Sequence, residues 1–168
     1  MSTPQPHDQL TILAALLDQM PAYLASDAVF RPVMVQEGGL HQTATLTIGN
    51  VLDLFKRLGD LGSGTGPGTD RQRLAELRSR FDVLRTSQHA AYGAKLGREL
   101  KGQLDSWRWS VDDAVRGGDG PGGDDRPDPG LRARIEQLLT EAKGQGIDVT
   151  EARRRMAELD ERLRSTSR

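Results

Sequence analysis

The segment from Asp70 to Arg116 constrains the fold most, because it contains no proline and its residues favour helix. As one straight helix it would extend roughly 70 Å at ~1.5 Å per residue. A compact domain of this chain's length has a diameter of about 40 Å. An unbroken helix over this segment would therefore project beyond its own domain.

Apolar residues in this segment form two stripes that point in different directions. At ~100° per residue, the second stripe lies roughly 130° around the helix axis from the first. Continuing the first stripe would place Lys95 in the core, so the phase changes between Gln88 and Lys95. The first stripe comprises Leu74, Leu77, Phe81 and Leu84, and the second comprises Leu96, Leu100, Leu104, Trp107, Val111 and Val115.

Two structures agree with this pattern. Either the helix breaks near Gly93 and folds back, or one bent helix packs against different neighbours at its two ends. A single glycine inside a helix costs only about 1 kcal/mol. We therefore expect one long, continuous helix.

The segments before residue 70 predict two further helices. Asp8 is a good N-cap for the first, in which Pro21 introduces a kink or starts a second helix. Thr47 caps another helix that ends near Leu58. Between them, residues 33–47 form either a short β-hairpin or an irregular loop.

Glycine, proline and aspartate dominate residues 117–130, which predicts a disordered acidic linker. Residues 131–168 then form a helical hairpin, with a capping-box-like start at Asp148. The predicted fold is mainly α, with an up-and-down antiparallel helical bundle over residues 1–116 and a C-terminal helical hairpin. Charged residues three or four apart are expected to pair along solvated helix faces, as in Glu76 with Arg80, Glu151 with Arg155, and Asp160 with Arg164.

The composition excludes several classes of function. A net charge of −1 gives no overall attraction to nucleic acid or anionic lipid. The absence of cysteine excludes a disulfide scaffold, a thiolate zinc site and a thiol nucleophile. No basic segment precedes an apolar stretch, and the longest apolar run is far shorter than the ~20 residues that span a bilayer. We expect a soluble cytoplasmic protein.

The motifs that could carry chemistry are weak. Residues 118–123 match the dinucleotide pattern G-x-G-x-x-G, but no strand precedes them and the nearby aspartates would repel phosphate. The three histidines lack the spacing of a metalloprotease or a di-iron bundle. We therefore predict no catalytic, cofactor-binding or metal site, and no cofactor. If a general base exists, His89 is the best candidate, followed by His41.

Trp109 is the leading candidate for an interface residue. It lies almost opposite Trp107 around the helix, and tryptophan is enriched among the residues that dominate binding energy. The alternative is that another part of the chain covers it. Four arginines flank the first stripe at positions where charge selects a neighbouring helix, namely Arg73, Arg78, Arg80 and Arg85.

These observations predict a non-catalytic helical scaffold or interaction protein that binds another protein or a second copy of itself. The first alternative is an enzyme whose site, between bundle helices, combines His89 or His41 with carboxylates. The second is weak binding of nucleic acid through the arginine-flanked face of residues 71–85, although the acidic residues among these arginines disfavour it.

Overall fold

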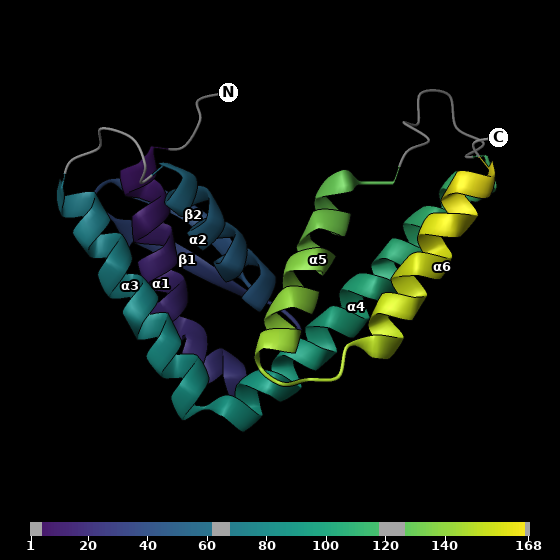
Figure 1. Ribbon diagram of the computed structural model, residues 1–168. Coiled ribbons are helices and arrows are strands. Elements are labelled where there is room, and N and C mark those ends of the chain that lie inside the picture. Colours follow the sequence, from purple (N-terminus) through teal and green to yellow (C-terminus); the bar gives the residue numbers. More distant parts are fainter. Residues whose placement is uncertain (1–4, 62–67, 118–126, 167–168) are drawn as a thin grey trace. The chain divides into compact units, whose positions relative to one another are not determined.

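The computed structural model describes residues 5–61, 68–117 and 127–166. These residues form six helices and a two-stranded antiparallel sheet (Figure 1), so the predicted mainly helical fold is confirmed. No helix in these three ranges is both long enough and apolar enough to cross a membrane.

The chain divides into two compact units, residues 1–95 and residues 96–168. The division falls inside a helix, α4 (His89–Val115), so this one element contributes to both units. The expected domains, 1–116 and 131–168, stay a prediction. Most of the predicted linker between them lies outside the described residues, as do residues 118–123 with their glycine pattern.

Helix α1 (Pro6–Leu24) supplies much of the core of the first unit. Its predicted apolar stripe is buried, and Pro21 lies inside the helix without starting a second one. The helix begins at Pro6, so Asp8, the predicted N-cap, lies instead in its first turn. Gln5 occupies the N-cap without a side-chain hydrogen bond, and Pro6 suits the first helical position because a backbone N–H there would have no helical partner.

Strands β1 (Arg31–Glu37) and β2 (Leu40–Leu46) form a hairpin, which resolves the two interpretations of residues 33–47. Gly38 and Gly39 make the turn with φ values of 62° and 84°. A two-residue turn that follows the twist of the strands requires positive φ at both positions, which glycine adopts without strain. The inner face of the hairpin packs on α1 and buries Val33 and Val35.

Helices α2 (Ile48–Leu61) and α3 (Gly68–Ser87) complete the first unit with the first turns of α4. Thr47 Oγ1 accepts a hydrogen bond from the Asn50 amide at 3.0 Å, which confirms the predicted cap. The ring of Phe81 lies between those of Phe55 and Tyr92, with centroid distances of 5.3 and 6.0 Å. This aromatic cluster joins α2, α3 and the start of α4.

The expected continuous helix over residues 70–116 is wrong. Helix α3 ends at Ser87 and α4 begins at His89 (Figure 1). The break at Gln88 marks the N-terminal edge of the segment where the two apolar stripes change phase. Two stripes that point in different directions cannot be covered by the same neighbours, and a break lets each stripe pack separately.

The second unit consists of the remainder of α4 with α5 (Pro129–Gly144) and α6 (Thr150–Thr166). Arg155 pairs with Asp105 at 2.9 Å and Arg162 pairs with Asp112 at 2.6 Å, and both pairs join residues 50 apart. Helices α4 and α6 therefore run in the same direction. Their core faces, with that of α5, comprise Leu96, Leu100, Leu104, Trp107, Val111, Ile135, Leu138, Leu139, Ala142, Met156 and Leu159.

Candidate functional site

The two tryptophans of α4 have opposite environments. Trp107 is 3% exposed and belongs to the core of the second unit, whereas Trp109 is 62% exposed. The two residues lie about 200° apart around a helix that advances ~100° per residue. Trp109 therefore presents a large apolar ring on a helix whose other side is anchored in the core.

The helix around Trp109 is tied to its neighbour. Asp105 and Asp112 lie one turn before and one turn after the tryptophan, and Arg155 and Arg162 of α6 bind their carboxylates. Such partly exposed ion pairs stabilise by no more than about 1 kcal/mol each. Their structural effect is to hold α6 in register beside the face that carries Trp109.

The four candidate arginines lie on α3, in the first unit, and Trp109 lies in the second. The guanidinium carbons of Arg78 and Arg85 lie 5.2 Å and 5.5 Å from the ring centroids of Phe55 and Phe81. Arg80 pairs with Asp18 of α1 at 2.5 Å. Three of the four arginines thus contact their own unit, while Arg73 is half-buried.

The histidines are not assembled into a catalytic group. His41 and His89 are exposed, and neither side chain forms a hydrogen bond or ion pair with another described residue. His7 lies 3.8 Å from an Asp70 carboxylate oxygen but is 70% exposed. Within the described ranges, no three His, Cys, Asp or Glu side chains are grouped to hold a metal ion. The histidine beside a carboxylate in a pocket, which the enzyme hypothesis requires, is not formed by His41 or His89.

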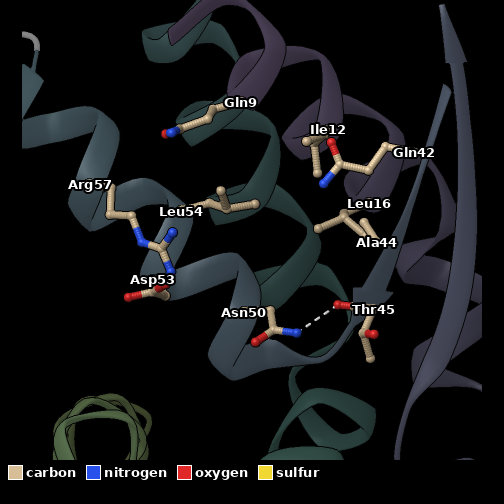
Figure 2. Close-up of a pocket in the computed structure, with 10 residues that line it drawn as sticks. All are labelled: Gln9, Ile12, Leu16, Gln42, Ala44, Thr45, Asn50, Asp53, Leu54 and Arg57. Atoms are coloured by element: carbon tan, nitrogen blue, oxygen red, sulfur yellow. Dashed lines mark hydrogen bonds and ion pairs between the residues drawn. The ribbon is translucent and has the colours of Figure 1, made fainter. Parts of the chain in front are cut away.

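A pocket of about 200 Å³ lies in the first unit between α1, β2 and α2 (Figure 2). Asn50 Nδ2 donates to the carbonyl oxygen of Thr45 at 2.8 Å, and Asp53 pairs with Arg57. These polar groups are thus engaged with the protein itself, and the volume is below the roughly 300–1,000 Å³ of ordinary ligand sites. The lining residues are Gln9, Ile12, Leu16, Gln42, Ala44, Thr45, Asn50, Asp53, Leu54 and Arg57.

Two buried charged residues escaped the sequence reasoning. Lys95 is 1% exposed and Glu99, one turn later on α4, is 2% exposed. The expectation that Lys95 could not lie in a core is wrong, because its Nζ donates to the Ser26 carbonyl at 2.6 Å and lies 4.0 Å from the centroid of the Tyr23 ring. A hydrogen bond and an aromatic face offset the cost of removing an ammonium group from water. The sequence signal for this burial was the spacing of Lys95 and Glu99. These opposite charges are four residues apart, and each directly precedes a leucine of the second stripe, Leu96 or Leu100.

Several side chains of the second unit have shifted pKa values, and the causes are ion pairs and the hydrogen bonds at the start of α6. A hydrogen bond with Asp160 raises the pKa of Arg132 above its usual value. Hydrogen bonds from Thr150 lower the pKa of Asp148, and a hydrogen bond from Arg154 lowers that of Glu151. These shifts arise from hydrogen bonds and ion pairs of exposed or half-exposed groups on α5, on α6 and at the start of α6.

Comparison with known proteins adds no functional information. No protein-family model, curated protein or solved structure significantly matches this chain.

Proposed function

We propose that this chain is a non-catalytic helical interaction protein, which binds another protein against the face of α4 that carries Trp109. The observation that carries the proposal is the 62% exposure of this indole on a helix whose opposite face is buried. Tryptophan buries 150–250 Å² when a partner covers it and is enriched among residues that dominate binding energy.

The charges around Trp109 indicate the chemistry of the partner. Asp105 and Asp112 are balanced by arginines of α6, whereas Asp113, one turn after the tryptophan, is exposed. A partner that fits this surface has an apolar pocket for the indole and a basic group at the edge of that pocket. Opposite charges at the rim of an interface raise the association rate and favour the correct partner.

The attachment of α4 to α6 also supports binding. A surface that keeps the same geometry when free and when bound loses less conformational entropy on association. The pairs Asp105–Arg155 and Asp112–Arg162 restrict the movement of the helix on both sides of Trp109. The indole is therefore displayed on an ordered support.

The test compares Trp109→Ala with Val83→Ala in the full chain. Val83 is 65% exposed on α3, so its truncation controls for the loss of an exposed apolar side chain elsewhere. Each immobilised protein is exposed to native cell extract, the retained proteins are identified by mass spectrometry, and circular dichroism checks the fold. We expect a specific protein to be retained by the wild type and by Val83→Ala, and to be lost, at least tenfold, with Trp109→Ala.

Equal retention of that protein by the wild type and Trp109→Ala would contradict the proposal. So would a wild-type chain that retains no specific protein from the extract, since no association at Trp109 would then require explanation.

A further inference from the structure

Strand β1 has one free edge. Its turn-proximal pair, Glu37 with Leu40, closes a two-residue turn, so the two residues face each other through backbone hydrogen bonds. Because the two kinds of antiparallel pair alternate, Pro32, Met34 and Gln36 direct their backbone groups away from β2. All three residues are exposed, and no strand pairs with this edge in the part of the chain that the structure describes.

The outer face of β1 is more apolar than a solvated strand requires. Pro32 and Met34 alternate along β1, so their side chains lie on the same side of the hairpin, and Phe30 immediately precedes the strand. Phe30 is 65% exposed and Met34 is 68% exposed. A hairpin with its other face on α1 would ordinarily carry polar residues here. Pro32 fits an edge strand, since its missing N–H would point away from β2.

The sequence of β1, Arg-Pro-Val-Met-Val-Gln-Glu, is complementary to itself when it is read in opposite directions. We propose that two copies of this protein pair through the free edges of β1, antiparallel and centred on Met34, to form a continuous four-stranded sheet. Arg31 then lies opposite Glu37 of the second copy, and Val33 lies opposite Val35 of the second copy. In this register each charged side chain lies opposite one of the other sign, and each valine lies opposite a valine.

The backbone groups fit this register. Met34 exchanges both of its hydrogen bonds with Met34 of the second copy, because its amide and carbonyl point to the free edge. Each Gln36 amide donates to the Pro32 carbonyl of the other copy. Pro32 has no N–H and so removes one bond at each end, which makes the association modest and leaves the central bonds intact.

The charges select this register over its neighbours. A shift by two residues in either direction keeps the backbone alternation but places a charged side chain opposite a valine. Within one copy, Arg31 and Glu37 are separated by six residues of strand, about 20 Å at ~3.3 Å per residue. They cannot pair with each other, and neither forms an ion pair with another described residue.

This inference is independent of the proposed role of Trp109, since it concerns a different surface and a different partner. It predicts that the wild-type chain dimerises with increasing concentration in sedimentation equilibrium. Arg31→Glu and Glu37→Arg each place like charges opposite one another at two symmetric positions, and each should raise the dissociation constant of the dimer about tenfold. The double variant Arg31→Glu/Glu37→Arg should restore it.

The charge swap separates pairing between copies from damage to the hairpin. Because the two residues are too far apart to interact within one chain, rescue by the double variant requires contact between two chains. A wild type that stays monomeric, or a double variant as weak as the single variants, would overturn the proposal. Trp109→Ala should leave dimerisation unchanged, and loss of the dimer in that variant would assign self-association to α4 instead.

The absence of cysteine allows a second test of the register. With Met34→Cys, the two thiols would sit on residues whose Cα atoms lie about 5.5 Å apart, within the range that a disulfide spans. Thr43, which pairs with Met34 on β2, is the matched control. In the proposed sheet the two Thr43 residues are three strand spacings apart, about 14 Å. With oxidised glutathione added as the oxidant, Met34→Cys should form a disulfide-linked dimer at least tenfold faster than Thr43→Cys, and equal rates would refute the register.

Discussion

The buried ammonium group of Lys95 helps to fix the segment that follows α1. Its Nζ donates to the Ser26 carbonyl, and the hydroxyl of Tyr23 donates to the carbonyl of Val29 at 2.7 Å. Both bonds end on the short connection between α1 and β1. The exposed Val29 and Phe30 therefore belong to a segment held at two points, although half or more of each side chain is in solvent.

We expect Lys95→Ala to lower the free energy of unfolding by about 2–3 kcal/mol. The change leaves a cavity against the Tyr23 ring and removes the donor to the Ser26 carbonyl. Urea denaturation measures the loss. The control is Lys101→Ala, which removes an exposed lysine from the same helix and should stay within about 0.5 kcal/mol of the wild type. Equal losses in the two variants would show that the buried contacts of Lys95 contribute nothing.

Residue patterns predicted the direction of Trp109 but not its surroundings. Its position relative to Trp107 follows from helix geometry alone, because both lie on one helix. The arginines of α6 that flank it could not be predicted, since they depend on which helices pack together. The same reason explains Lys95, whose burial requires the end of α1 beside it.

At the scale of the elements, a helix cap was predicted correctly, whereas the ion pairs expected along single helices were not. Thr47 caps α2 as predicted, because a cap involves residues only three positions apart. Arg80, Arg155 and Asp160 were expected to pair within their own helices. They pair instead with Asp18, Asp105 and Arg132 on other helices. A pair along one helix contributes only about 0.2–0.5 kcal/mol, so packing decides which partner is used.

The exposed glycines of α4 should be replaceable with a gain in stability. A Cβ atom added at Gly97 or Gly102 would meet nothing within 4 Å, and neither residue has a positive φ. Gly97→Ala and Gly102→Ala should each raise the free energy of unfolding by about 0.5–1 kcal/mol in thermal or urea denaturation. Gly39→Ala is the contrast: space is also open there, but φ is 84°, so the variant should be destabilised. A loss of stability at Gly97 or Gly102 would contradict this prediction.

The hydrogen bond at the start of α6 should make the stability of the second unit depend on pH. Asp148 Oδ1 accepts a hydrogen bond from the Thr150 amide at 3.0 Å, and the pKa of this carboxyl is lowered by Thr150. A group whose pKa is lower in the folded state stabilises above its unfolded pKa and loses that effect as pH falls through the folded pKa. Asp148→Asn keeps a hydrogen-bond acceptor but does not titrate.

Wild-type protein should therefore be more stable than Asp148→Asn at pH 7, and the difference should vanish as the pH falls below about 4. Thermal unfolding followed by tryptophan fluorescence reports this, because both tryptophans lie in the second unit. A difference between the two proteins that stays constant from pH 7 to pH 3 would show that the ionised form of Asp148 has no role.

At the scale of the whole molecule, the decisive fact is that α4 contributes to two compact units. The two stripes predicted that the segment meets two sets of neighbours, and this part of the prediction holds on either side of the boundary between Lys95 and Leu96. The boundary between the two units, between Lys95 and Leu96, lies at the C-terminal end of the predicted phase change, so the apolar pattern indicates its position although composition does not. It is set by which side chains α4 packs against along its length.

Two units with separate cores should respond separately to core truncation. Leu13 of α1 and Leu138 of α5 are both 0% exposed, one in each unit. Each change to alanine removes similar apolar contacts and should destabilise by about 2–5 kcal/mol. Because domains unfold in cooperative units, the loss should be concentrated in the unit that carries the substitution.

Hydrogen exchange with mass spectrometry distinguishes the units. Leu138→Ala should accelerate amide exchange in α5 and α6 by tenfold or more while changing that of α1 and β1 much less, and Leu13→Ala should do the reverse. Tryptophan fluorescence, which follows only the second unit, should give a lower urea midpoint for Leu138→Ala than for Leu13→Ala. If both substitutions accelerate exchange equally in every helix, the chain unfolds as one cooperative unit. The stabilities of the two cores are then coupled through α4.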